Sequence, residues 1–122
     1  MDISDSLKDL KVHKRQFTKV EYLYRDYGNW KFWGEFWLNG IVKYDDIKPF
    51  FLDENLFVPR ELGIPSLTPE KMNDDDHWLH EIINVSIDEL PYKHAPILER
   101  EQFLLRLKAA HVKGWYSLCP WV

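Results

Sequence analysis

The sequence has little cysteine and no long apolar stretch. Cys119 is its one cysteine, which excludes an internal disulfide, and its position beside Pro120 near the C-terminus is more typical of a small buried side chain than of a nucleophile. The apolar runs are far shorter than the ~20 residues of a membrane-spanning helix, so we expect no membrane partner. Residues 1–10 alternate acidic and apolar side chains, unlike a signal peptide. Together these absences predict a cytoplasmic protein.

Motifs for common chemistries are missing as well. The five glycines are scattered and form neither a phosphate-binding loop nor a dinucleotide fingerprint. No serine, histidine and aspartate can be assembled into the order of a hydrolase triad. We therefore expect no cofactor, and our first hypothesis is a role other than catalysis.

The composition is that of one small globular domain spanning residues 1–122. Hydrophobic residues make up 45% and charged residues 30%, whereas the aromatic share of 16% is high. The net charge of −4 hides an uneven distribution. Residues 11–31 contain six Lys and Arg against two acidic residues, and residues 45–99 contain thirteen Asp and Glu against four basic residues. This division favours two differently charged regions and a field that steers a charged partner.

The stretch from Tyr22 to Trp37 concentrates aromatic rings on both sides of Asp26-Tyr27-Gly28-Asn29. Strong β-formers around a turn sequence predict a hairpin with strands over residues 17–25 and 30–38. Alternation along these strands assigns five rings to the core: Tyr22, Tyr24, Trp30, Phe32 and Phe36. The remaining polar and aromatic side chains form the predicted binding surface: Arg25, Asp26, Asn29, Lys31, Trp33 and Trp37.

The rest of the chain predicts two more strands and two helices, of which the C-terminal helix is the major one. We expect a short third strand over 41–44, a helix starting near Asp45 with Pro49 in its first turn, and an irregular connection over 57–69. Residues 78–87 are rich in β-branched side chains and predict a strand. Residues 97–112 have helical periodicity that ends at Gly114, and residues 1–14 form an arm or short helix. The fold class is α+β, an antiparallel sheet with one major C-terminal helix packed across a face.

The segment from Asp74 to Glu81 is rich in groups that ligate metals. Its candidate ligands for a divalent metal are Asp76, His77, His80 and Glu81. On a helix the two histidines converge on one ion, whereas on a strand they point to opposite faces. The alternative is a solvated acidic loop that leads into the strand, and the β-branched run that follows favours this alternative.

The hairpin also resembles a pattern found in small uncharacterised bacterial proteins. The residues that carry the resemblance are Tyr22-Leu-Tyr-Arg-Asp-Tyr-Gly-Asn-Trp-Lys31, followed by Gly34, and they match Tyr-x-Tyr-Arg-Asp-x-x-Asn-Tyr/Trp-Lys. The resemblance covers this hairpin. It implies no activity, cofactor or catalytic residue, but it suggests that four residues act as a unit: Arg25, Asp26, Asn29 and Lys31.

Two hypotheses for function follow. The first is a protein that binds a macromolecule through its aromatic sheet or its acidic region, with a protein partner or a second copy of the chain favoured over a nucleic acid. The alternative is a metal-dependent or nucleic-acid-processing enzyme with a site around Asp74–Glu81 and Arg25-Asp26.

Overall fold

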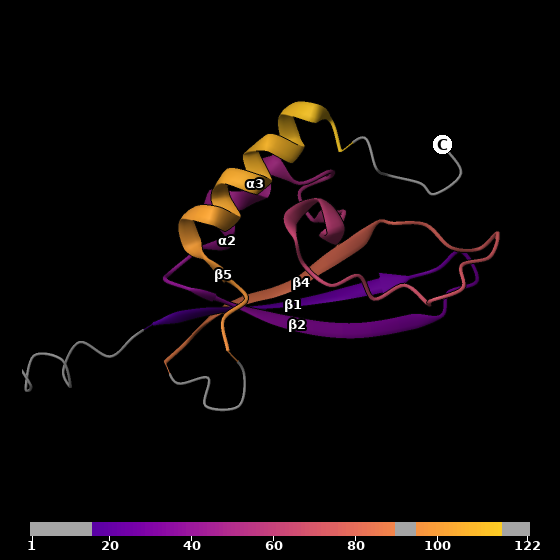
Figure 1. The fold of residues 1–122 in the computed structure, drawn as a ribbon, viewed down its shortest axis with the longest axis horizontal. Helices are drawn as coiled ribbons and strands as arrows, with labels where there is room; N and C mark the ends of the chain where they lie inside the picture. Colours follow the sequence, from indigo (N-terminus) through magenta and orange to yellow (C-terminus); the bar gives the residue numbers. More distant parts are fainter. Residues whose placement is uncertain (1–15, 90–94, 116–122) are drawn as a thin grey trace, which may run out of the picture.

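The computed structural model describes residues 16–89 and 95–115, and these residues form an α+β fold, as the sequence predicts. A curled five-stranded sheet has the strand order β3-β4-β1-β2-β5, and the helices lie on one side of it (Figure 1). The elements are β1 (Phe17–Arg25), β2 (Lys31–Asn39), α2 (Tyr44–Ile47), η1 (Lys48–Phe50), β3 (Leu56–Phe57), η2 (Pro59–Leu62), β4 (His80–Asp88), β5 (Leu98–Glu99) and α3 (Arg100–Lys113). The predicted arm over 1–14 and Cys119 lie outside the described residues.

The predicted hairpin is confirmed, and its register is regular. β1 pairs antiparallel with β2 from Phe17 opposite Asn39 to Arg25 opposite Lys31, and antiparallel with β4 on its other side. The sheet is mixed rather than purely antiparallel, because β5 runs parallel to β2. A parallel neighbour requires a long crossover between the two strands, and the chain from α2 to β4 supplies it.

The core lies between the sheet and α3. The β1 face that alternation assigned to the core is fully buried and consists of Thr18, Val20, Tyr22 and Tyr24. α3 contributes Phe103, Leu107 and Ala110 to this core, a spacing that places the three side chains on one helix face. The helix begins with a capping box at Glu99 and ends at Gly114, whose φ of 73° is the left-handed C-cap that the sequence predicts.

The predicted strand over 41–44 is wrong. Gly40 turns the chain with a φ of 106°, and the segment after it is held at the end of β1 by a side chain instead of a strand partner. The Thr18 hydroxyl donates to the carbonyl of Gly40 at 2.8 Å and accepts the N–H of Val42 at 2.8 Å. α2 then starts at Tyr44, and the turn of η1 contains Pro49 near its start, close to the predicted helix.

None of the helices in the described ranges is long and apolar enough to cross a membrane.

Candidate functional site

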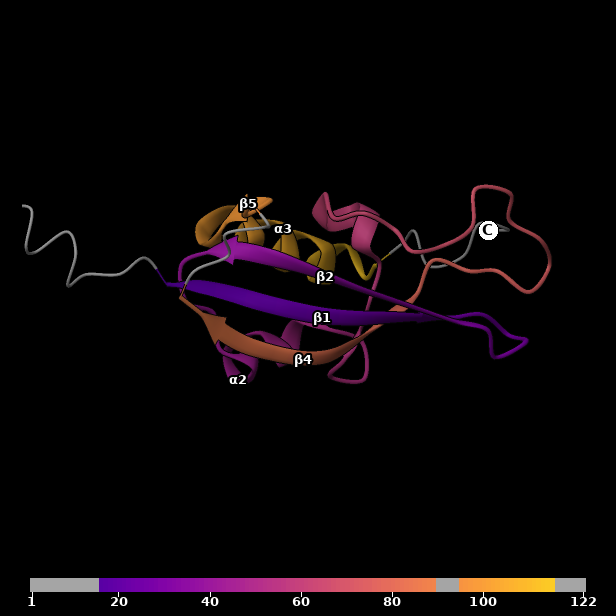
Figure 2. The ribbon, with the colours of Figure 1, turned by 90° about the horizontal axis from the view of Figure 1, so that it is seen from below.

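The end of the hairpin extends past the helix that covers the core. In Figure 2, β1 and β2 continue beyond α3 toward their turn, and the loop before β4 lies at the same end of the molecule. A backbone hydrogen bond joins the two, because Tyr27 donates its N–H to the carbonyl of Asp75 at 2.9 Å. We call residues 73–78 the distal loop. The distal end therefore consists of the hairpin turn and this loop.

Four large rings at this end are exposed. Among the described residues, nine large apolar side chains are exposed, and four of them fall within residues 27–33. We call these four the distal aromatic surface: Tyr27 (70% exposed), Trp30 (72%), Phe32 (45%) and Trp33 (64%). Phe32 lies on the core side of the sheet and Trp33 on the outer side, so the four rings surround the end of the hairpin rather than sharing one face. Isolated exposed apolar residues are ordinary, but several together indicate an interaction site.

The assignment of Trp30 and Phe32 to the core is wrong. Phe32 lies opposite Tyr24, on the core side of the sheet as alternation predicts, and the two rings stack with centroids 6.3 Å apart. However, the helices end before this part of the hairpin (Figure 2), and the distal loop covers Tyr24 of β1 on this side but leaves Phe32 of β2 partly exposed. The side of the sheet to which Phe32 points was predicted correctly, but its exposure to solvent was not.

Trp37 does not belong to the exposed surface. It lies opposite Lys19 on the outer side of the sheet, as predicted, but its side chain is only 6% exposed. The indole Nε1 donates to Asp88 Oδ2 at 3.1 Å, and the Lys19 ammonium lies 5.9 Å from the centre of the ring. The other predicted surface residues behave differently: Arg25, Asn29, Lys31 and Trp33 are exposed, and Asp26 is half-buried.

The four residues suggested to act as a unit divide into two pairs. Asp26 and Asn29 build the turn, because Asp26 Oδ1 accepts the N–H of Trp30 at 2.8 Å and Asn29 donates its N–H to the carbonyl of Asp26 at 3.0 Å. Asn29 has a φ of 68°, so it, rather than Gly28, supplies the left-handed residue of the turn. Arg25 and Lys31 face each other across the strands, and Arg25 lies 3.7 Å from a Glu81 oxygen.

A buried polar network fastens the distal loop to the hairpin. The Tyr24 hydroxyl donates to Asp76 Oδ1 at 2.6 Å, and the second carboxylate oxygen accepts the N–H of Asn73 at 2.9 Å. Tyr24 and Asp76 are both buried. Burial, followed by the Asp76 carboxylate, raises the pKa of the Tyr24 phenol. The hydroxyl thus stays protonated and remains a donor to the loop.

The predicted metal ligands do not gather into a site. The described residues contain no group of three or more His, Cys, Asp and Glu side chains that could hold a metal ion. Both ring nitrogens of His77 are engaged, since Nδ1 accepts the N–H of Leu79 at 3.0 Å and Nε2 donates to the carbonyl of Arg25 at 2.8 Å. Glu81 lies beside Arg25. His77 therefore serves to bind the loop to the end of β1.

His80 is a core residue rather than a ligand. Its Nε2 accepts the N–H of Leu67 at 3.0 Å, and its Nδ1 lies 3.0 Å from the carbonyl of Trp78. These contacts require the neutral ring with its proton on Nδ1. Burial, which outweighs the hydrogen bond to Trp78, lowers the pKa of His80 from 6.5 to about 4. Neither ring nitrogen has a free lone pair for a metal.

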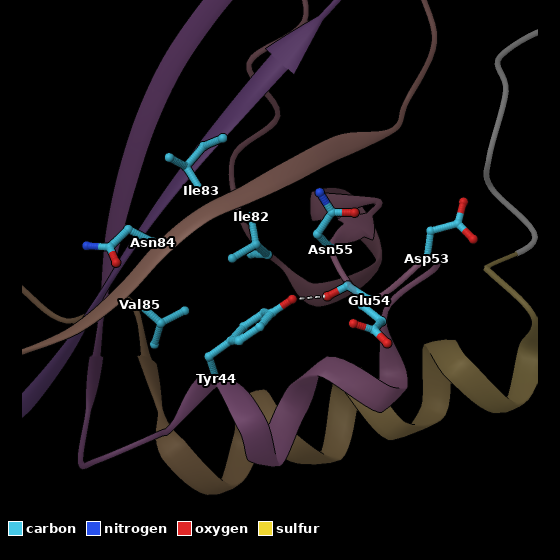
Figure 3. A pocket seen from close by; sticks show the side chains of 8 residues that line it. All are labelled: Tyr44, Asp53, Glu54, Asn55, Ile82, Ile83, Asn84 and Val85. Atoms are coloured by element: carbon cyan, nitrogen blue, oxygen red, sulfur yellow. Dashed lines mark hydrogen bonds between the residues drawn. The ribbon is translucent and has the colours of Figure 1, made fainter.

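A separate pocket of about 480 Å³ lies beside β4. Figure 3 shows Tyr44 of α2 reaching across it toward the turn at residues 53–55, with Ile82–Val85 of β4 along one wall. The Tyr44 hydroxyl donates to the carbonyl of Glu54 at 2.6 Å, and Asn55 accepts the N–H of Ile82 at 2.8 Å through its own carbonyl. The first contact attaches the turn to α2, and the second attaches it to β4. Sequence reasoning did not identify this pocket.

Sequence reasoning also missed Tyr27, Trp30 and Phe32 as surface residues.

Comparisons with family models, with curated proteins and with solved structures found no match. The candidate site is therefore defined by its own geometry: exposed rings on a turn that is fixed by hydrogen bonds.

Proposed function

We propose that this protein binds another protein through the distal aromatic surface. The observation that carries the proposal is the gathering of exposed Tyr27, Trp30, Phe32 and Trp33 within seven residues. Trp and Tyr are the side chains most enriched at the energetic centres of protein interfaces, because each buries a large area at a small loss of side-chain entropy. A cytoplasmic location, as the sequence predicts, belongs to the same proposal.

The rigidity of the distal end supports this proposal. The turn is held by Asp26, and the loop behind it is held by Tyr24, Asp76 and His77 through hydrogen bonds of 2.6 to 3.2 Å. The Tyr27 ring lies 4.9 Å from the His77 ring, which fixes its orientation as well. A rigid surface loses little conformational entropy on binding, so more of the contact energy appears as affinity.

The charges near the rings favour a protein over a nucleic acid. Arg25 and Lys31 flank the surface, but the distal loop brings acidic residues to the same turn, since Asp75 contacts the backbone of Tyr27 and its carboxylate lies close to Gly28. Asp74 is next in sequence and is exposed. Phosphate groups are repelled by such carboxylates, whereas a protein surface can present charges of both signs.

The test compares the proteins captured by two double variants, each of which replaces two exposed apolar side chains with serine. Tyr27→Ser with Trp30→Ser removes two rings of the surface, and Leu105→Ser with Val112→Ser removes two exposed apolar side chains from α3. Each protein is immobilised, exposed to a lysate of the source organism, and its bound proteins are quantified by mass spectrometry. The partner is then purified and titrated against each variant.

We expect the partner to bind the native and α3-variant proteins equally. Loss of two central aromatic side chains should weaken its binding at least ~30-fold, because each such anchor contributes about 1 kcal/mol or more. A partner that binds the ring variant as tightly as the native chain would contradict the proposal. Circular dichroism of both variants checks that the fold is retained.

A further inference from the structure

The outer edge of β2 has no partner strand over half of its length in the described part of the chain. β5 pairs with β2 at Leu38 and Asn39, and Ile97 donates its N–H to the carbonyl of Trp37 at 3.0 Å. Before these contacts, residues 31–35 form the border of the sheet on this side. Such an edge presents N–H and C=O groups to which another strand can bond.

Alternation along β2 fixes which of these groups point outward. The carbonyl of Trp37 points toward β5, and every second residue of a strand directs its backbone groups to the same side. Lys31, Trp33 and Glu35 therefore direct their N–H and C=O groups away from β1. No backbone group of another segment among the described residues bonds to these three.

We propose that a second copy of this chain pairs with this edge, the two β2 strands running antiparallel about a two-fold axis at Trp33. Lys31 of each copy then lies opposite Glu35 of the other, and the two Trp33 residues lie opposite each other. Each opposite pair exchanges two backbone hydrogen bonds, giving about six bonds in all. The pairing is closed and self-complementary, as a two-fold dimer requires.

The charges select this register. Shifting one strand by two residues places Lys31 or Glu35 opposite Trp33 and leaves the charges unmatched. Opposite charges in directly facing positions stabilise a strand pair, whereas like charges destabilise it. The register centred on Trp33 matches both charged pairs at once, and it ends before the position where β5 begins.

Within one copy, the same charges are poorly balanced. Lys31 lies opposite Arg25 and Glu35 lies opposite Glu21, so both facing pairs carry like charges. Glu35 is compensated by Lys19, whose ammonium is 3.4 Å away. No ion pair joins Lys31 to a carboxylate among the described residues. A second copy supplies the missing carboxylate.

The core side of the edge also fits the same register. Phe32, which is partly exposed, lies opposite Gly34 of the other copy, a position without a side chain. Leu67 packs directly over Gly34, since a Cβ built on this glycine would meet Leu67 Cδ2 at 2.7 Å. The Phe32 ring therefore reaches an apolar neighbour, Leu67, across the pair.

Two features that keep edge strands apart, a bulge and a proline, are not found in this stretch. Charged side chains such as Lys31 also protect an edge, but in the proposed register each of them faces an opposite charge. The β1–β4 pairing has a register shift at Glu21/Tyr22, but the β1–β2 register is unbroken, and residues 31–35 contain no proline. The inference rests on the proposed function, because Phe32 and Trp33 belong to the distal aromatic surface, and it names the partner as a second copy.

The test uses charge reversal and sedimentation of the full chain. Native protein is expected to sediment as a concentration-dependent dimer of the 14.8 kDa chain between about 10 μM and about 1 mM. In a dimer of the Lys31→Glu variant, the introduced carboxylate of each copy faces Glu35 of the other copy. In a dimer of the Glu35→Lys variant, the introduced ammonium group of each copy faces Lys31 of the other copy. Each variant should weaken the dimer at least ~10-fold.

Mixing the two variants supplies the decisive measurement. In the mixed dimer, the carboxylate introduced by Lys31→Glu faces the ammonium group introduced by Glu35→Lys, and the native Glu35 of the first variant faces the native Lys31 of the second. Both charged pairs are therefore restored, and we expect a heterodimer as tight as the native dimer. Lys71→Glu makes the same charge change at an exposed loop position and should leave the dimer unchanged.

Three outcomes would overturn the inference: native protein that stays monomeric over the whole range, single variants that dimerise like the native chain, or a mixture that stays monomeric. The carboxylate introduced by Lys31→Glu faces Arg25 favourably within one copy, so loss of the fold does not explain a monomeric state of this variant. A monomeric native protein that still captures another protein through Tyr27 and Trp30 leaves the proposed function intact. A dimer without such capture leaves the second copy as the partner.

Discussion

Acidification should destabilise the fold through one residue, His80. The ring is fully buried and packs against Tyr22, Tyr24 and Phe57 at centroid distances of 5.0 to 6.1 Å. Its Nε2 accepts the N–H of Leu67 at 3.0 Å. A proton on Nε2 would place two donors face to face and a charge in an apolar environment, so the folded chain binds this proton poorly.

The size of the effect follows from the difference between the two states. The pKa of His80 is lowered from 6.5 to about 4, with burial as the main cause. Below pH 6.5 the unfolded chain takes up the proton, but the folded chain does not until the pH approaches 4. The free energy of unfolding therefore falls as the pH decreases through this window, by about 3 kcal/mol in total. Above pH 6.5 this contribution is constant.

Urea unfolding at a series of pH values from 7.5 to 4 measures this dependence, and a variant isolates the residue. His80→Gln retains a side chain that can accept from Leu67 and does not titrate, so its unfolding free energy should depend less steeply on pH than that of the native chain. His111→Gln, at an exposed position on α3, is the matched control and should follow the native curve. Parallel curves for the native and His80→Gln proteins would refute the reasoning, because another group would then carry the dependence.

Three further predictions concern stability in urea at neutral pH. Tyr24→Phe should cost about 1–3 kcal/mol by removing the donor to buried Asp76, and it should cost much less in an Asp76→Ala background, where no acceptor is left for the hydroxyl; additive effects would contradict the hydrogen bond. Gly34→Ala should cost about 1–3 kcal/mol, because the new Cβ would lie 2.7 Å from Leu67, and Leu67→Ala should relieve part of this cost; equal costs in both backgrounds would contradict the steric cause. Asn29→Val should cost about 1–2 kcal/mol at its φ of 68°, whereas Asn29→Gly should be nearly neutral; similar costs for both would argue against strain.

The hairpin could be predicted because the local sequence determines it strongly. Both strands alternate, and residues 26–29 form a turn, so the predicted bounds of β1 match the structure and those of β2 differ by one residue. α3 was equally visible, because its buried residues recur at helical spacing and Gly114 ends it. The parallel pairing of β5 with β2 was not predictable. It depends on two residues of β5 that meet β2 only after the long crossover is packed.

For the candidate site, the sequence predicted the side of the sheet to which the aromatic side chains point, but not their exposure to solvent. Alternation placed Phe32 on the core side and Trp37 on the outer side, and both placements are correct. The exposure of these side chains depends on which elements pack over each side of the sheet. The lengths of those elements determine how much of the hairpin they cover. Nine extended residues span ~30 Å, whereas the fourteen residues of α3 span ~21 Å, so the helix cannot cover the whole hairpin. A comparison of predicted element lengths is the sequence signal that points to an uncovered end.

The predicted metal ligands form no group in the described part of the chain, for a related reason. Spacing along the chain identified Asp76, His77 and His80 as groups that can ligate, but a lone pair is available only if no nearby donor uses it. The distal loop must satisfy its own backbone N–H groups without a strand or helix, and the side chains of Asp76 and His77 accept two of them, from Asn73 and Leu79. The same polar atoms that suggested chemistry hold the loop in place. The fixed loop in turn holds the end of the hairpin, and this rigidity supports the proposal of a binding surface at this end of the molecule.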